Sequence, residues 1–173
     1  MRMWSKLALM GTLVATPALA GDGLDALLHS APVTSAIALP DPTHVPIVFG
    51  KDIPWKDGNG MHQALLFGNP DKPGIYGVLI RWEPGHYSHP HFHTTDRYAY
   101  VVSGTWWVRS STHWDPATAY PVPAGSYVRD IANTVHWDGA RAGEKEPAVL
   151  ELVGMGPVKT IQVDENGKPK PGQ

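Results

Sequence analysis

The sequence contains no cysteine among its 173 residues. Disulfide bonds, thiol nucleophiles and zinc–thiolate sites are therefore excluded as sources of stability or chemistry. The sequence also has no large excess of positive or negative charge, because it contains 14 Lys and Arg and 16 Asp and Glu, for a formal net charge of −2. The basic residues form no cluster of the kind that phosphate binding requires, so nucleic acid is not expected as a partner.

The signatures of several common enzyme classes are also absent. The sequence has no Gly-x-Ser-x-Gly elbow, no phosphate-binding glycine loop and no His-Glu-x-x-His helix. A long apolar run is missing as well. The chemistry of this protein must therefore come from another arrangement of side chains.

Residues 1–20 have the pattern of a signal peptide. Arg2 and Lys6 form a basic start, residues 7–14 are apolar, and residues 18–20 form a small-x-small cleavage site before Gly21. The apolar run is too short to span a bilayer comfortably; the alternatives are an uncleaved membrane anchor or an ordinary N-terminal helix. Cleavage would leave 12 basic and 16 acidic residues, a formal charge of −4. We expect a periplasmic or secreted protein that is free of the membrane after cleavage.

Glycine and proline are abundant, with 18 and 17 residues, and they separate short apolar runs. This pattern predicts an all-β fold in one antiparallel domain, residues 47–163. Residues 21–46 are expected to form an extended N-terminal arm, because four prolines prevent a long helix, and residues 164–173 a flexible polar tail. Strands are expected at 63–67, 75–82, 98–102, 105–109, 118–122, 127–130, 135–138 and 149–153, with an edge strand within 158–163.

Three histidines have the spacing of a metal site. His91 and His93 are separated by one residue, so on an extended strand their side chains leave the same face, about 6 to 7 Å apart along the strand. This separation lets two imidazoles share one ion. A transition metal needs at least a third protein ligand, which in a sheet normally comes from a strand distant in sequence. His136 is the best candidate for that ligand.

The residues around these histidines resemble the two motifs of the cupin family, G-x5-H-x-H-x3-E-x6-G and G-x5-P-x-G-x2-H. The matching positions are Gly85, His91, His93, Gly104, Gly125 and His136. In the second motif Ile131 and Asn133 replace the usual Pro and Gly. The resemblance covers roughly residues 60–155 and implies a small antiparallel β-barrel, or jelly roll, that binds one divalent transition metal.

Arg97 stands where the family has its metal-binding glutamate. A guanidinium cannot ligate a metal, so the resemblance implies a three-histidine site, a variation known among cupin dioxygenases. In one interpretation Arg97 has a catalytic role, clamping the carboxylate or enolate of an anionic substrate whose other oxygen binds the metal. In the other, Arg97 pairs with Asp96, Asp138 or another carboxylate and closes the barrel mouth.

Glu151 is the second candidate catalytic residue. It lies in the apolar run of residues 149–153, where an unpaired carboxylate would be costly. Pointing inward, it could be a fourth ligand, an acceptor that orients a ligand, or a general base. Pointing outward, it would pair with an arginine such as Arg81 or Arg109.

Two functions from different classes fit these residues. The first is an exported metalloenzyme that acts on a small anionic, chelating molecule: iron(II) would favour dioxygenase chemistry, whereas zinc or manganese would support isomerase or lyase chemistry. The second is a non-catalytic periplasmic protein that binds a metal or a small ligand, and a third possibility is a metal with a purely structural role. Cupins commonly pair, and one of the adjacent Trp106 and Trp107 must face outward and need cover, so a homodimer is also expected.

Overall fold

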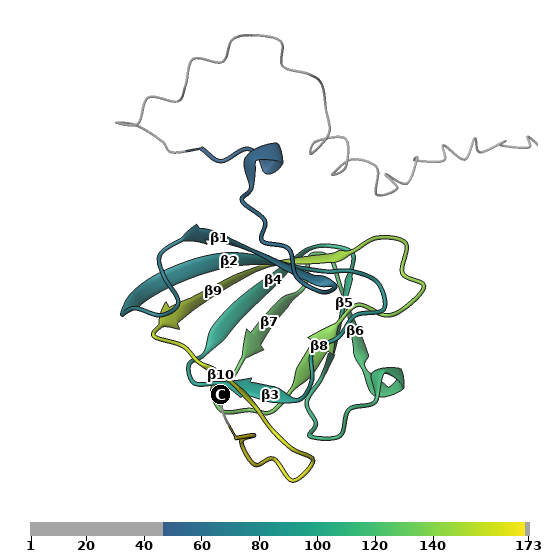
Figure 1. Ribbon diagram of the computed structural model, residues 1–173. Helices are drawn as coiled ribbons and strands as arrows, with labels where there is room; N and C mark the ends of the chain where they lie inside the picture. The colour runs from purple at the N-terminus through teal and green to yellow at the C-terminus, as the bar shows by residue number, and fades with distance from the viewer. Residues whose placement is uncertain (1–46, 172–173) are drawn as a thin grey trace, which may run out of the picture. The chain divides into compact units, whose positions relative to one another are not determined.

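The computed structural model describes residues 47–171, which contain ten strands and two short 3-10 turns (Figure 1). The chain divides after Gly50, and every strand of the described part lies in the unit Lys51–Gln173. The elements are η1 (Gly50–Asp52), β1 (Met61–Phe67), β2 (Gly74–Trp82), β3 (His91–His93), β4 (Arg97–Ser103), β5 (Thr105–Arg109), η2 (Pro116–Thr118), β6 (Tyr120–Pro123), β7 (Tyr127–Asp130), β8 (Trp137–Gly139), β9 (Ala148–Gly156) and β10 (Thr160–Gln162). The expected signal peptide and N-terminal arm lie outside the described residues.

The strands form three antiparallel sheets. Five strands pair in the order β1-β2-β9-β4-β7, three in the order β6-β5-β8, and β3 pairs with β10. In Figure 1 the five-stranded and three-stranded sheets lie on opposite sides, and β3 and β10 cross between them at one end. The prediction of an all-β antiparallel fold is confirmed. No helix in the described part of the chain is long and apolar enough to cross a membrane.

Every predicted strand forms, although most have shifted ends. The strands at 105–109 and 127–130 have the predicted bounds. β9 is longer than expected because its pairing with β2 continues from Ala148 opposite Trp82 to Gly156 opposite Gly74. The strand expected at 118–122 starts later, since Pro116–Thr118 form a 3-10 turn whose N-cap, Asp115, accepts a hydrogen bond from the Ala117 N–H at 3.1 Å.

β9 lies between β2 and β4, with one face inside the barrel and the other outside. Its residues alternate between buried and partly exposed, as the period of two in a strand requires. Leu150 packs inside with Trp82, Val101 and Trp106 in one buried cluster, and Leu152 packs in a second cluster with other residues of β2. The adjacent tryptophans do face opposite ways.

The outward-facing Trp107 is covered within the same chain. The guanidinium carbon of Arg141 lies 3.5 Å from the centre of the Trp107 ring, and the indole N–H donates to Glu144 Oε1 at 2.9 Å. Cation–π stacking and this hydrogen bond satisfy both the face and the edge of the ring. Trp107 therefore needs no partner subunit for its cover.

The buried carboxylate of Asp138 joins separate parts of the barrel. Its Oδ2 accepts hydrogen bonds from the indole N–H groups of Trp82 in β2, at 3.1 Å, and Trp106 in β5, at 2.8 Å. Its Oδ1 accepts from the Ser88 hydroxyl at 2.9 Å. Three donors on one carboxylate compensate for its removal from water and tie the two larger sheets to the chain that leads into β3.

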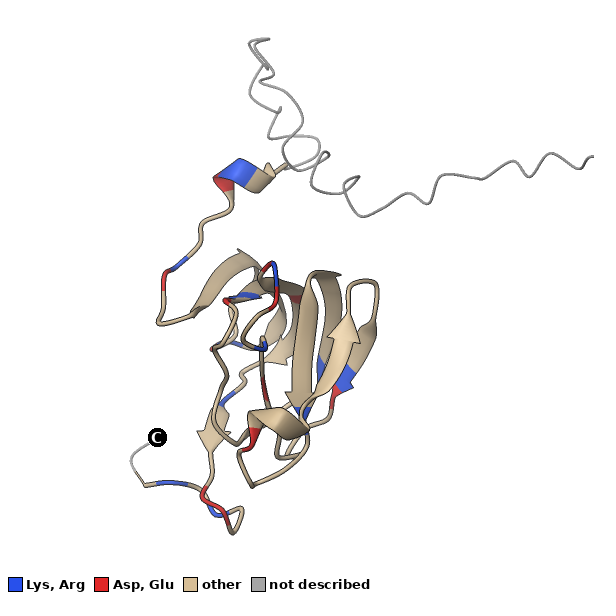
Figure 2. Ribbon diagram, turned by 90° about the vertical axis from the view of Figure 1, so that its right-hand side faces the viewer, with Lys and Arg blue, Asp and Glu red and all other residues tan. Residues whose placement is uncertain are grey.

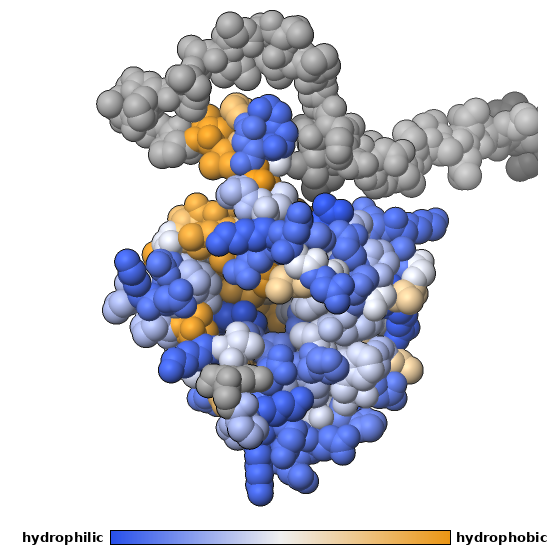
Figure 3. All heavy atoms as spheres, viewed as in Figure 1, coloured by the Kyte–Doolittle hydropathy of each residue, from blue (hydrophilic) through white to orange (hydrophobic). Residues whose placement is uncertain are grey.

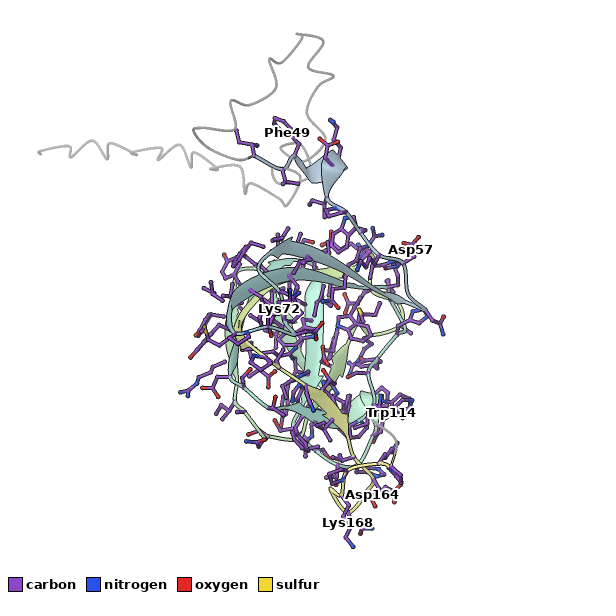
Figure 4. All side chains as sticks on the ribbon, turned by 60° about the vertical axis from the view of Figure 1, so that its left-hand side comes forward. Phe49, Asp57, Lys72, Trp114, Asp164 and Lys168 are labelled. Atoms are coloured by element: carbon purple, nitrogen blue, oxygen red, sulfur yellow. The ribbon has the colours of Figure 1, made fainter. Side chains whose placement is uncertain are left out.

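The chain after β10 returns to the barrel. Asp164 Oδ1 accepts hydrogen bonds from the backbone N–H groups of Asn166 and Lys168, both at 2.9 Å, and Lys170 N–H donates to the Gln162 carbonyl at 2.9 Å. Figure 4 shows this turn at the end of the barrel away from Asp57. The described part of the expected flexible tail is thus a hydrogen-bonded turn.

Charged residues are distributed in keeping with the near-neutral composition. Figure 2 shows positive and negative positions interspersed, mostly in loops and at strand ends. Two cross-strand ion pairs lie next to each other between β4 and β7: Arg129 with Asp96 at 2.6 Å, and Arg97 with Asp130 at 2.7 Å. The first is on the outside of the sheet and the second is inside.

Replacing Asp138 by Ala is expected to destabilise the fold strongly. The substitution leaves two indole N–H groups buried without their acceptor, which costs about 2 to 5 kcal/mol in total. Urea unfolding followed by tryptophan fluorescence measures the change in the free energy of unfolding. The matched control is Asp57→Ala, which removes a carboxylate whose side chain is 93% exposed and should change stability by less than about 0.5 kcal/mol. Similar effects of the two substitutions would contradict the proposed role of Asp138.

Candidate metal centre

The structure brings the three predicted histidines together. His91 and His93 are the ends of β3, and His136 lies just before β8. An antiparallel bridge joins the two segments, with His91 N–H donating to the His136 carbonyl at 2.9 Å and His136 N–H donating to the His91 carbonyl at 2.8 Å. All three side chains are buried, and their ligand atoms lie within 4.8 Å of one another.

Each imidazole has a hydrogen-bond partner at its outer nitrogen. Nδ1 of His91 lies 2.8 Å from the His89 carbonyl, and Nδ1 of His136 lies 3.0 Å from the Thr134 carbonyl. Because a carbonyl only accepts, these Nδ1 atoms carry the proton and leave Nε2 as a lone pair. Nδ1 of His93 lies 3.0 Å from the hydroxyl of Thr160, on the neighbouring strand β10. Partners of this kind fix the tautomer and orientation of metal-binding histidines.

The spacing of the inner nitrogens fits a shared ion. Nε2 of His91 and Nε2 of His93 are 3.1 Å apart. Two lone pairs at this distance repel each other unless a cation or a proton lies between them. Two nitrogens bound at about 2.0 to 2.1 Å to one ion, in octahedral or tetrahedral geometry, lie about 3.0 to 3.4 Å apart. The residues therefore fit a transition metal.

The imidazoles of His91 and His93 are kept neutral, the form that binds an ion. Burial lowers the pKa of His91, although the carboxylate of Asp138 partly opposes this effect. Burial also lowers the pKa of His93 far below its usual value, and the charge of Arg97 lowers that pKa further. Neutral imidazole is the form that ligates metals, so no proton has to be removed near neutral pH.

Arg97 forms an ion pair with Asp130, a residue that the sequence analysis did not single out. Nε and Nη2 of Arg97 lie 2.8 and 2.7 Å from Asp130 Oδ2. Arg97 and Asp130 are direct partners in the β4–β7 register, and the Asp130 side chain is 8% exposed. Of the two interpretations of Arg97, the geometry supports the carboxylate pair, but with neither Asp96 nor Asp138.

Asp130 could have been found from the strand period. It lies two residues after Val128, which packs against the core, so both side chains point to the same face of β7. The structure adds that Asp130 reaches the histidines. Its Oδ2 lies 3.9 Å from Nε2 of His93, and its Oδ1 lies 3.5 Å from Nδ1 of His136.

A cavity of about 310 Å³ opens beside His93 inside the barrel. Its polar lining includes His93, Arg97, Tyr76, Gln63 and Thr160, and its apolar wall includes Val78, Ile80, Leu152 and Val158. Figure 3 shows a hollow in the barrel with hydrophobic residues along its wall. A smaller cavity of about 130 Å³ lies against His136 and Asp130. The histidines thus have space for a small molecule beside them.

One inner row of the five-stranded sheet leads from this cavity to Asp130. In register it consists of Tyr76, Gly154, Arg97 and Asp130. A Cβ at Gly154 would lie 2.7 Å from the Tyr76 hydroxyl, so the glycine lets that hydroxyl reach across β9. Burial raises the pKa of Tyr76, and Arg97 opposes this through its charge and a hydrogen bond. Tyr76 therefore keeps its proton and offers a neutral donor.

Glu151 is not brought to the histidines. It alternates with the buried Leu150 and Leu152, so its side chain lies on the outer face of β9, between Leu79 and Tyr100 in the register. A catalytic role for Glu151 therefore has no support from the geometry. Arg81, one of its expected partners, pairs with Glu83 at 2.8 Å instead.

The fold has relatives among solved structures, although no protein-family model and no curated protein matches the sequence. A protein of unknown function with a cupin-like fold from Ralstonia eutropha is 20% identical with a TM-score of 0.52; the match covers 64% of this chain and 63% of that one. A candidate acetylacetone dioxygenase from Methylibium petroleiphilum is 19% identical with a TM-score of 0.55; the match covers 73% of this chain and 85% of that one. The polyketide cyclase RemF from Streptomyces resistomycificus is 15% identical with a TM-score of 0.54; the match covers 71% of this chain and 89% of that one. Identities this low are evidence of a shared fold alone.

The metal-free protein is expected to lose stability as the pH falls below about 6.5, the usual pKa of histidine in an unfolded chain. Since the folded-state pKa values of His91 and His93 lie lower, the unfolded chain binds more protons in this range. Each histidine then costs up to about 1.4 kcal/mol per pH unit. Urea unfolding between pH 7.5 and pH 5 measures the slope. His93→Gln should reduce it, whereas substitution of the loop residue His113 should not; equal slopes in both variants would refute the assignment.

Proposed function

Because the chain has the cupin fold, we propose that it is a mononuclear metalloenzyme whose three histidines hold one divalent transition metal beside the barrel cavity. One observation carries the proposal. Three buried imidazoles converge on a common point, with their outer nitrogens hydrogen-bonded and two inner nitrogens 3.1 Å apart. A fold shared by many chemistries does not by itself identify the reaction, so the argument rests on these side chains.

We propose iron(II) as the metal. Imidazole ligands suit iron and zinc alike, so the donor set alone does not select one. A candidate acetylacetone dioxygenase shares the fold, and it favours iron as the first metal to test. Bound at this site, iron(II) would supply redox chemistry towards dioxygen, whereas zinc or manganese would supply Lewis-acid polarisation.

The proposed substrate is a small anionic molecule able to chelate the metal. The cavity beside His93 has aliphatic walls that would exclude water from an apolar body. Tyr76 supplies a hydrogen-bond donor, and Arg97, which also lines the cavity, keeps N–H groups beyond the two that bind Asp130. These groups would orient the anionic end of a substrate towards the histidines.

A non-catalytic binding protein is the second candidate function. The observation in its favour is that the carboxylates near the histidines are already engaged. Asp130 binds Arg97, and Asp138 accepts hydrogen bonds from Trp82 and Trp106. A reaction that needs a free carboxylate as general base has no such group there, although oxidation by dioxygen does not require one. Measuring catalytic turnover distinguishes the two candidate functions, because a binding protein would show none.

We also propose export and a homodimer. Export rests on the sequence of residues 1–20. A partner surface is suggested by exposed tyrosines on the outer face of the five-stranded sheet, where Tyr98 and Tyr127 stack with ring centres 6.5 Å apart and Tyr100 lies beside them. Aromatic side chains that are exposed together on a sheet face are typical of interfaces.

Elemental analysis of the mature protein, purified anaerobically without a histidine tag, is expected to find roughly one iron per chain. His91→Ala, His93→Ala and His136→Ala should each lower the iron content strongly, because each removes one of the three imidazoles that define the site. His113→Ala removes a histidine from a loop outside the site and should retain the metal. Zinc or manganese in place of iron would refute the choice of metal. No metal above the variants' background would refute the site.

Oxygen uptake is expected from the iron-loaded protein with at least one of three substrate classes, namely diketones, catechols and keto acids. Val158→Trp should fill the cavity and lower kcat/KM by at least about tenfold, since steric exclusion of the substrate costs more than 1.4 kcal/mol. Iron content should stay unchanged. Val153→Trp places the same side chain on the outer face of β9 and should leave kcat/KM unchanged. No uptake with any class would contradict the dioxygenase proposal.

A further inference from the structure

We infer that Asp130 supplies a fourth, anionic ligand to the metal, in place of the carboxylate that position 97 lacks. This inference rests on the metal site of the proposed function. Arg97 and Asp130 face each other directly across β4 and β7 and pair inside the barrel. The site thus keeps a carboxylate next to position 97, but the carboxylate comes from the neighbouring strand.

The distance between Asp130 and His93 suits a shared ion. Asp130 Oδ2 lies 3.9 Å from Nε2 of His93. An oxygen and a nitrogen that each bind one ion at about 2.1 Å are about 3.0 Å apart when they are cis and about 4.2 Å apart when they are trans. The observed distance lies within this range. Asp130 is also as deeply buried as the histidines, with 8% of its side chain exposed.

The charge balance of the site also favours Asp130 as a ligand. Three neutral imidazoles leave both charges of a divalent ion uncompensated in a buried site. Among the described residues, Asp130 places a carboxylate oxygen near an inner nitrogen, since its Oδ2 lies 3.9 Å from Nε2 of His93. Its Oδ1 lies near Nδ1 of His136, the nitrogen that faces away from the ion. A carboxylate has two oxygens with about four lone-pair sites, so Asp130 can bind an ion and still accept hydrogen bonds from Arg97.

Arg97 then has a role opposite to that of the glutamate it replaces. Its hydrogen bond from Nε and its ion pair through Nη2 hold Asp130 Oδ2 in place, but both compete with the metal for that oxygen. Its positive charge also repels a cation nearby. Removing Arg97 should therefore tighten metal binding, and removing the carboxylate of Asp130 should weaken it.

An alternative account is that Asp130 only neutralises Arg97. Under that account Asp130→Asn weakens metal binding because it leaves an unpaired guanidinium beside the site. Removing Arg97 as well would then restore the affinity. Under the ligand account the double variant stays weak, because a neutral amide does not replace the anionic carboxylate that binds the metal. The double variant therefore decides between the two.

The experiment is titration of the metal-free mature protein with cobalt(II), followed by calorimetry and by the visible absorption of the ion. The proteins are the wild type, Arg97→Gln, Asp130→Asn and the double variant. We expect Asp130→Asn to raise the Kd by about 10- to 100-fold and Arg97→Gln to lower it. The double variant should bind at least about tenfold more weakly than Arg97→Gln, with a changed absorption spectrum that reports the loss of one ligand.

Asp96→Asn is the matched control. Asp96 lies just before β4 and pairs with Arg129 of β7 outside the barrel, so the substitution removes the same charge from the neighbouring ion pair. It should leave the Kd and spectrum unchanged. A double variant with the Kd and spectrum of Arg97→Gln would overturn the inference alone. If wild-type protein bound no cobalt, the metal site of the proposed function would itself be refuted, and the inference with it.

Discussion

The site depends on one backbone interaction, the antiparallel bridge between His91 and His136. Two hydrogen bonds join these residues, whose positions are far apart in the chain. The bridge places the third imidazole beside the two that β3 already presents on one face. On the other side of β3, Thr160 of β10 fixes His93. A metal centre built this way is positioned by strand pairing.

Burial gives this arrangement its chemical character. Removal from water keeps His91 and His93 neutral, because burial lowers the pKa of both. The same low-dielectric surroundings make every nearby carboxylate costly unless it is compensated. Asp138 is compensated by indole and hydroxyl donors, and Asp130 by Arg97. The two buried carboxylates are therefore stabilised in different ways. Asp138 accepts hydrogen bonds from neutral donors and holds the sheets together, whereas Asp130 pairs with a cation and faces the histidines.

The inner row from Tyr76 to Asp130 connects the cavity with the site. Gly154 is the position that makes the row continuous, since a side chain there would collide with the Tyr76 hydroxyl. Arg97 thereby contacts both a neutral donor and a carboxylate. An anionic substrate in the cavity would thus bind the same guanidinium that binds Asp130, the carboxylate that we infer to ligate the ion. This shared group is how ligand binding and metal binding would influence each other.

The all-β fold, the strands and the three histidines were predictable from the amino-acid sequence. These follow from local rules, namely the period of two along a strand and the spacing of turn residues, together with the cupin resemblance. The pairing of Arg97 with Asp130, the outward direction of Glu151 and the contacts of the outer histidine nitrogens with His89, Thr134 and Thr160 became known only from the folded structure. These outcomes depend on the register between strands. Register is not a local property, because bulges such as the shift between Val101 and Ser103 in the β4–β9 pair change which residues face each other.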